Sequence, residues 1–154
     1  MSNDVIKNIA TNRRAWHEYR IEDRYEAGLV LKGTEVKSLR DAKVNMQDAY
    51  CAPQKGEMLL FNCHISPYKY GTHFNHEPLR TRKLLLNKKE IAKLTKAVEQ
   101  KGYTIVPLKM YFKNGIAKLE IGLARGKKLY DKRHDISERE NKRRLDRYMK
   151  EARR

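Results

Sequence analysis

The feature that most restricts the fold of this 154-residue chain is a pair of β-rich segments joined by Asn114-Gly115. Asn-Gly is a preferred two-residue hairpin turn, so residues 103–112 and 116–124 should pair as antiparallel strands. Pro107 should lie at an edge or a bulge, because proline cannot donate to the ladder. One face of the second strand should be buried through its alternating apolar residues, Leu119, Ile121 and Leu123.

Three further segments, residues 25–31, 48–53 and 58–65, are also typical of strands. Residues 54–57 contain Gly56 and should join the last two segments as a second hairpin. Pairing Pro53 with Met58 would then place Cys51 opposite Leu60. Residues 66–78 have no periodicity and should form an exposed loop.

Two helices are predicted from their capping residues. Thr34 could cap a short helix that ends at Leu39 or Arg40. Asn87 could cap a longer helix that has Glu90 in its third position and ends near Gly102. Five or six short strands with a short and a longer helix predict a mainly β fold, a small antiparallel barrel of the oligonucleotide-binding type.

Charge divides the chain into two regions. The net charge is +16, and residues 125–154 hold +7 of it with only six large apolar residues. Such a segment cannot bury enough apolar surface to offset its ordering entropy. We therefore predict a barrel domain over residues 1–124 and a basic tail over residues 125–154, disordered when free. The tail contains apolar residues at helical spacing: Leu145, Tyr148, Met149 and Ala152. This stripe favours a helix that forms on a charged partner; the alternative is a solvated basic tail with incidental periodicity.

Several protein classes are disfavoured. No apolar run is long enough to span a membrane, and the N-terminus carries no basic-then-apolar signal, so a cytoplasmic location is expected. Two cysteines are too few for a disulfide scaffold and should be small core residues. No His or Cys spacing suits a metal, and His73 and His76 are interpreted as surface residues. Residues 124–128 contain the pair Gly126-Lys127 but lack the first glycine and the closing serine or threonine of a phosphate-binding loop. Neither a cofactor nor catalysis is expected.

Two basic clusters indicate an RNA partner. Residues 78–83 contain Arg80, Arg82 and Lys83. Residues 12–19 interleave basic and aromatic side chains, as contacts to phosphates and stacked bases require: Arg13, Arg14, Trp16, His17 and Tyr19. The alternative for each cluster is a solvated surface with an aromatic residue partly in the core.

The chain also resembles a known family. Four strings carry the resemblance, in order along almost the whole chain: Glu26-Ala27-Gly28-Leu29, Gly33-Thr34-Glu35-Val36-Lys37-Ser38-Leu39-Arg40, Arg80-Thr81-Arg82-Lys83-Leu84-Leu85-Leu86-Asn87 and Gly126-Lys127-Lys128-Leu129-Tyr130-Asp131-Lys132-Arg133. They are similar to the small protein B, or SsrA-binding protein, family of bacteria. The resemblance implies a barrel that binds transfer-messenger RNA and brings it to stalled ribosomes during trans-translation.

The resemblance also implies roles for individual residues. Glu26, Leu85, Asn87 and Lys118 match family residues that bind the tRNA-like part of this RNA. Lys118 should project from the polar side of its strand toward phosphate. Asn87 is equally explained as a helix cap, and Leu85 by core packing. Glu26 could position a basic neighbour or accept a hydrogen bond from the RNA.

The resemblance implies that the tail acts at the decoding region of the small ribosomal subunit and becomes helical in the empty messenger channel. The matching positions are Gly126, Lys127, Lys128, Tyr130, Asp131, Lys132 and Arg133. Tyr130 stands where members of the family can carry histidine, so a role that needs a protonatable ring is not expected. Tyrosine can still stack on a base.

The predicted function is therefore a cytoplasmic RNA-binding adaptor that is not an enzyme and has no membrane partner. The high charge favours a monomer when RNA is absent. The main alternative is a general structured-RNA-binding or ribosomal protein, which would bind many structured RNAs equally. A nuclease would instead cleave RNA, and a membrane-surface role is disfavoured because the tail stripe has only three large apolar residues.

Overall fold

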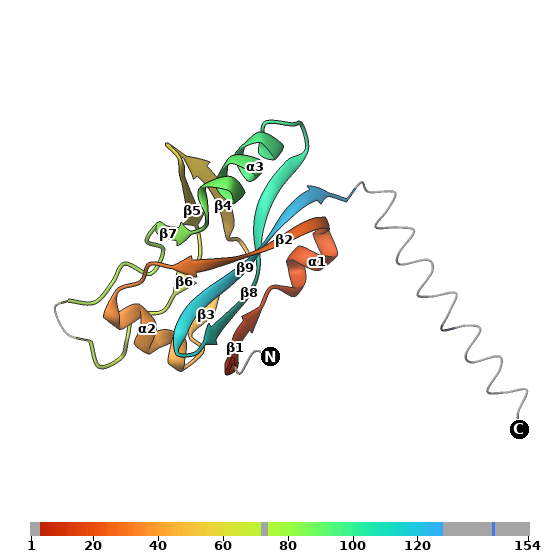
Figure 1. The fold of residues 1–154 in the computed structure, drawn as a ribbon. Coiled ribbons are helices and arrows are strands. Elements are labelled where there is room, and N and C mark those ends of the chain that lie inside the picture. The colour runs from red at the N-terminus through yellow and green to blue at the C-terminus, as the bar shows by residue number, and fades with distance from the viewer. Residues whose placement is uncertain (1–3, 72–73, 128–142, 144–154) are drawn as a thin grey trace, which may run out of the picture.

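The computed structural model describes residues 4–71, 74–127 and 143. Figure 1 shows a curved β structure flanked by three helices. The elements, in chain order, are β1 (Ile6–Thr11), α1 (Arg13–Glu18), β2 (Tyr19–Leu29), α2 (Gly33–Arg40), β3 (Val44–Asn45), β4 (Tyr50–Gln54), β5 (Glu57–Phe61), β6 (His64–Ile65), β7 (Arg82–Leu85), α3 (Lys88–Val98), β8 (Tyr103–Lys113) and β9 (Ile116–Gly126).

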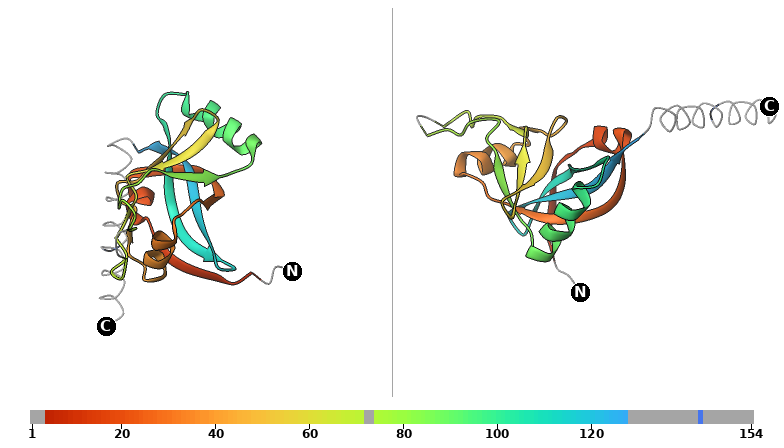
Figure 2. Two further views of the ribbon diagram at one scale, coloured as in Figure 1. Left: turned by 90° about the vertical axis from the view of Figure 1, so that its left-hand side faces the viewer. Right: turned by 90° about the horizontal axis from the view of Figure 1, so that it is seen from above.

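The main sheet closes into an antiparallel barrel. Its strands follow the order β1-β8-β4-β5-β7-β2-β9, and β8 also pairs with β9, which completes a ring from β8 to β9. β1 lies outside the ring, paired with β8. The views in Figure 2 show how β2, β8 and β9 curve around the barrel. The predicted mainly β, antiparallel barrel is confirmed, and its closure is a result of the three-dimensional structure.

Turn chemistry sets the two predicted hairpins. Asn114 and Gly115 have φ angles of 52° and 79°, as the favoured turn requires, and join β8 to β9. The register shifts just after Pro107, so the predicted bulge is present. In the β4–β5 hairpin, Pro53 is opposite Met58 and Cys51 is opposite Leu60, as predicted.

The barrel encloses the main hydrophobic core. Its fully buried side chains come from α2, α3 and most strands, and they include Leu39, Met58, Leu60, Leu84, Leu94, Ile105, Met110, Leu119 and Ile121. Cys51 and Cys63 are free and buried as expected, and burial raises the pKa of the Cys63 thiol to about 11. Both thiols are therefore protonated, inert packing groups near neutral pH.

A second, smaller core lies between α1 and the barrel wall. Ala15 of α1 packs there with Val106, Leu108 and Ala124. Gly122 lies beneath the same contact, and a Cβ at this position would be 2.9 Å from Cδ1 of Leu108. A side chain there would therefore displace the wall against which α1 packs.

The N-terminal part of the fold differs from the sequence-based prediction. β1 and α1 were not predicted, and β2 begins at Tyr19 rather than Tyr25. Charged residues interrupt the apolar pattern before Tyr25, and the strand is long because it pairs with β9 along most of its length. Tertiary pairing therefore outweighs the weak local signal.

The start of α2 and the position of His76 also differ. Lys32, not Thr34, precedes the first turn, and its backbone N–H donates to Oε1 of Glu35 at 2.8 Å. Thr34 instead shares a 2.9 Å hydrogen bond with Nδ1 of His76, whose Nε2 lies 2.8 Å from the carbonyl oxygen of Ile65. His76 is buried, so the interpretation as a surface residue was wrong.

The barrel continues slightly beyond the predicted domain boundary. Arg125 and Gly126 belong to β9, and Gly126 is opposite Tyr19. The residues of the predicted tail stripe lie outside the described part of the chain. None of the described helices is long and apolar enough to cross a membrane.

Candidate nucleic-acid interface

One cross-strand row joins residues from four strands of the barrel. Gly28 of β2 is opposite both Leu85 of β7 and Lys118 of β9, and Lys118 is opposite Tyr111 of β8. Residues directly opposite each other in a sheet share a face. We call this surface, with Glu26 two positions along β2, the outer face. Glu26, Leu85 and Lys118, three of the four residues for which the family resemblance implies RNA binding, are therefore brought together.

The glycine in this row determines how Leu85 lies. Gly28 has no side chain, and a Cβ there would be 3.3 Å from Cβ of Leu85. Leu85 is 54% exposed, so it contributes little to the core and offers apolar surface to a partner. Exposure of this size does not fit the core-packing alternative for Leu85.

Glu26 is held by two neighbours on β8. The hydroxyl of Tyr111 donates to Oε2, and Nζ of Lys113 lies 3.3 Å from Oε1. The Tyr111 hydrogen bond, followed by the charges of Lys113 and Lys118, keeps the pKa of Glu26 below its usual value. The ionised carboxylate orders a basic neighbour, which is one of the two roles considered for it.

Tyr111 and Lys113 were missed in the sequence as members of this site. The signal was available, because a two-residue Asn-Gly turn sets the register of the whole hairpin. That register places Tyr111 opposite Lys118. Counting outward from the turn would have assigned Tyr111 to the polar face of its strand.

The outer face continues toward α1. Arg24 lies two positions before Glu26 on β2. Its Nη1 is 3.8 Å from Oε1 of Glu120 on β9, and its Cζ is 5.9 Å from the Trp16 ring centroid. Trp16 is 43% exposed, and Arg13 and His17 are exposed on the same helix.

Arg14 differs from its neighbours on α1. Its guanidinium makes ion pairs with Glu18 at 2.9 Å and with Asp48 at 3.1 Å. The basic-aromatic cluster of α1 therefore borders the outer face, with one arginine paired locally.

The other basic cluster is largely structural. Arg82 is fully buried, donates through Nε to Glu35 and through Nη1 to the carbonyl oxygen of Cys63 at 2.6 Å. Arg80 also donates to Glu35, and Lys83 pairs with Glu57 at 3.1 Å. The predicted RNA contact at Arg82 does not fit this burial, and we correct the interpretation of Arg82 to a structural role.

Glu35 is the centre of that buried cluster. Burial favours the neutral carboxyl, but hydrogen bonds from Arg80, from the backbone of Lys32 and from Arg82 outweigh it and lower the pKa of Glu35. The ionised cluster ties α2 to β7. A buried charge of this kind is tolerated because it is paired and hydrogen-bonded.

Asn87 is a helix cap, as predicted. It precedes α3, its backbone N–H lies 3.3 Å from Oε1 of Glu90, and its carbonyl accepts from the N–H of Ile91 at 3.0 Å. Asn87 is also exposed, two positions after Leu85. Of the predicted tail residues, Gly126 and Lys127 are described, and Lys128, Tyr130 and residues 131–133 lie outside the described residues.

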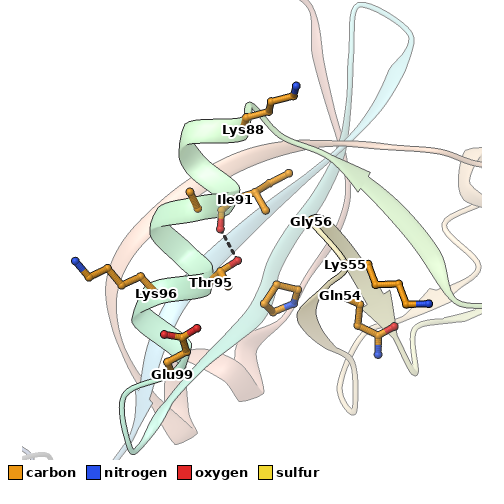
Figure 3. Close-up of a pocket in the computed structure, with 10 residues that line it drawn as sticks. Gln54, Lys55, Gly56, Lys88, Ile91, Thr95, Lys96 and Glu99 are labelled. Carbon is orange, nitrogen blue, oxygen red and sulfur yellow. Dashed lines mark hydrogen bonds between the residues drawn. The ribbon is translucent and has the colours of Figure 1, made fainter.

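A separate groove of about 610 Å³ lies between α3 and the β4–β5 turn. Figure 3 shows Ile91 and Thr95 on the helix, with Gly56 across the groove, while the Lys55 and Lys96 side chains extend away from it on its two sides. The sequence did not predict this groove, because it joins elements distant along the chain. Among the described residues, no group of three or more His, Cys, Asp or Glu side chains could hold a metal ion.

A closed antiparallel barrel whose outer face presents Lys118, Glu26 and the exposed Leu85, with the buried Tyr111 holding Glu26, is of the oligonucleotide-binding type. Comparison with known proteins gives the particular family. Residues 9–151 match the family model described as SmpB protein, and the chain belongs to this family.

Relatives of similar length support the assignment. The SsrA-binding protein of Bacillus cytotoxicus is 57% identical over 145 residues, covering 94% of each chain. That of Desulfitobacterium hafniense is 51% identical over 151 residues, covering 98% of this chain and 97% of its own.

A solved structure described as "tmRNA-SmpB: a journey to the center of the bacterial ribosome" is also similar. It has a TM-score of 0.67 and 53% identity, and the match covers 78% of this chain and 85% of that one. The resemblance noted in the sequence is confirmed.

Proposed function

We propose that this protein is an RNA-binding adaptor that binds transfer-messenger RNA and delivers it to stalled ribosomes in trans-translation. The observation that carries the proposal is the outer face, where Glu26, Leu85 and Lys118 meet in a member of the SmpB family. The names of its relatives and of the similar structure support the same RNA and the bacterial ribosome as partners.

The chemistry of the outer face suits a structured RNA. Lys118 can neutralise a phosphate, and Leu85 offers apolar contact to a base or sugar. Glu26 orders Lys113 and can accept a hydrogen bond from a 2′-hydroxyl. Asn87 presents an amide beside this surface while its backbone caps α3.

We assign different tasks to the two regions. The barrel, residues 1–124 in the predicted division, holds the RNA, and the basic tail recognises the decoding region when messenger is missing. The tail residues proposed for this task are Gly126, Lys127, Lys128, Tyr130, Asp131, Lys132 and Arg133. The protein acts in the cytoplasm, as a monomer before it binds RNA, and it catalyses no reaction.

Competition binding near 0.15 M salt tests the RNA assignment. Full-length protein should prefer transfer-messenger RNA to an ordinary tRNA and to an unrelated hairpin. Equal affinity for all three RNAs would indicate a general RNA-binding protein instead. Cleavage of labelled RNA in the presence of magnesium would identify a nuclease.

A tail variant tests the division of tasks. Replacing Asp131, Lys132 and Arg133 by alanine should leave the affinity for transfer-messenger RNA within about twofold, yet abolish tagging of stalled chains in a translation assay. Loss of RNA affinity in this variant would contradict the assignment of RNA binding to the barrel.

A further inference from the structure

A second concave surface lies beyond the end of β2. A pocket of about 440 Å³ opens between the C-terminal end of α2 and the segment after β6. Its lining residues are Ser38, Asp41, Lys43, Ser66, Pro67, Tyr68 and Lys69. We call it the Tyr68 pocket. Its size falls within the range of small-molecule sites and is sufficient for one nucleotide base.

Hydrogen bonds fix the walls of the Tyr68 pocket. The hydroxyl of Ser38 donates to the carbonyl oxygen of Ser66 at 2.7 Å, and the N–H of Ser66 donates to the carbonyl oxygen of Lys43 at 3.0 Å. The side-chain amide of Asn75 makes two hydrogen bonds with the backbone of Tyr68: it accepts from the N–H at 3.1 Å and donates to the carbonyl oxygen at 2.9 Å. The pocket is therefore formed before any ligand binds.

Aromatic and basic side chains lie next to Tyr68, which lines the pocket. The rings of Tyr68 and Tyr70 meet edge to face at 5.6 Å. Nζ of Lys37 lies 5.5 Å from the Tyr68 ring centroid, and Nζ of Lys69 lies 4.8 Å from that of Tyr70. Tyr70 is 71% exposed, so most of its ring is available for stacking.

The charge at the mouth is unbalanced. Lys43 and Lys69 line the pocket together with one acidic residue, Asp41, and Lys37 lies beside the Tyr68 ring. Within the described ranges, no carboxylate lies within 4.0 Å of any of these three ammonium groups, whereas Lys83 and Lys113 on the barrel are paired. Exposed aromatic rings beside unpaired lysines are the combination that binds unstacked bases and their phosphates.

We propose that the Tyr68 pocket holds an unpaired base of transfer-messenger RNA, with the surrounding lysines on the adjacent phosphates. This inference rests on the proposed function, because it concerns the same RNA. α2 follows β2 after a short connection, so the pocket lies near the end of β2, the strand that carries Glu26 and Gly28.

The position of the pocket favours this RNA over the ribosome. Figure 1 and the right-hand view in Figure 2 place α2 and the segment after β6 at the end of the barrel opposite the end of β9. The chain continues toward the tail from β9. If the tail engages the ribosome, the Tyr68 pocket lies at the far end, where it can serve the RNA that the barrel carries.

Substitutions of the two tyrosines test the proposal in the full-length chain. Tyr70→Ala and Tyr68→Ala should each weaken binding of transfer-messenger RNA about tenfold, the size expected for one lost base–aromatic stack. Tyr68→Phe keeps the ring and should bind within twofold of wild type. Tyr50→Ala removes an aromatic residue of 42% exposure elsewhere and should also change affinity less than twofold.

RNA affinities must be compared between variants that are folded to the same extent. Tyr70→Ala removes only a largely exposed ring and should unfold in urea at the wild-type midpoint, so it provides the test even if Tyr68→Ala does not fold. Ultraviolet cross-linking of the wild-type complex, followed by mass spectrometry, should find a nucleotide attached to Tyr68 or Tyr70.

The outcomes separate this inference from the proposed function. If Tyr70→Ala binds like wild type and neither tyrosine cross-links, the pocket proposal is overturned while the function stands. If the tyrosine variants lose ribosome binding but keep the RNA, the pocket serves another partner and the proposal is also overturned. If wild type shows no preference for transfer-messenger RNA, the proposed function fails first.

Discussion

Two glutamates of this chain each contact two basic or hydroxyl donors, yet they belong to different parts of the molecule. Glu35 is fully buried between Arg80 and Arg82 and joins α2 to β7. Glu26 is exposed on β2 and receives Tyr111 and Lys113. In both clusters the donors keep the pKa of the carboxyl below its usual value.

Burial accounts for the difference between the clusters. In the Glu35 cluster, removing the carboxylate would leave the buried Arg82 without its counter-charge, which is costly. In the Glu26 cluster, water can replace a lost partner, so the same types of residue remain available for a ligand. A sequence motif of arginines and lysines therefore does not reveal which cations contact RNA until their burial is known.

The largest effect should come from Glu35→Gln. The change leaves Arg82 buried without its counter-charge, and it should lower the free energy of unfolding by about 3–5 kcal/mol. Urea denaturation measures this loss. Glu57→Gln, which removes the exposed partner of Lys83, is the matched control and should cost less than about 1 kcal/mol. Equal losses of unfolding free energy in the two variants would contradict the distinction between buried and exposed clusters.

The pH dependence of stability should sharpen the same comparison. The pKa of Glu35 is lower in the folded than in the unfolded chain, so its stabilisation is present above the unfolded value of about 4.3 and is lost as pH falls through the folded value. The difference in stability between wild type and Glu35→Gln should therefore narrow below about pH 5. Urea midpoints between pH 7 and pH 3 measure it, and a constant difference would contradict the assignment.

Lys118→Ala should weaken RNA binding without changing the stability of the fold, whereas Glu35→Gln acts on stability. Removing this charge from the outer face should weaken binding of transfer-messenger RNA about tenfold and reduce the slope of log affinity against log salt by about 1. The urea midpoint should not move. Lys55→Ala, an exposed lysine at the β4–β5 turn, controls for net charge. An equal loss in the two variants would indicate a nonspecific charge effect.

The smallest effect should follow from Tyr111→Phe. It removes the hydroxyl that donates to Glu26, but Lys113 still contacts the carboxylate. We expect a stability loss of about 1 kcal/mol and RNA binding about twofold weaker. A calorimetric unfolding scan and the competition assay measure the two quantities. A loss as large as that of Glu35→Gln would show that the outer face is also essential to the fold.

Local chemistry made much of the fold predictable. Asn114-Gly115 fixes a turn through the φ angles of two residues, and Asn87 caps α3 through its own backbone. Both signals act over a few residues, so they can be read without knowing the rest of the chain. The four family strings are equally visible, because they depend on residue order alone.

The candidate site needed information that no short segment carries. Leu85, Gly28 and Lys118 meet because β2 pairs with β7 on one side and with β9 on the other, over separations of up to 90 residues. Arg80, Arg82 and Lys83 look alike in the sequence, but β7 directs Arg82 into the interior and Lys83 outward. The sequence alone determined the type of residue at each position. Strand register and burial arise only when distant strands close the barrel. They decided which charges stabilise the fold and which remain available to RNA.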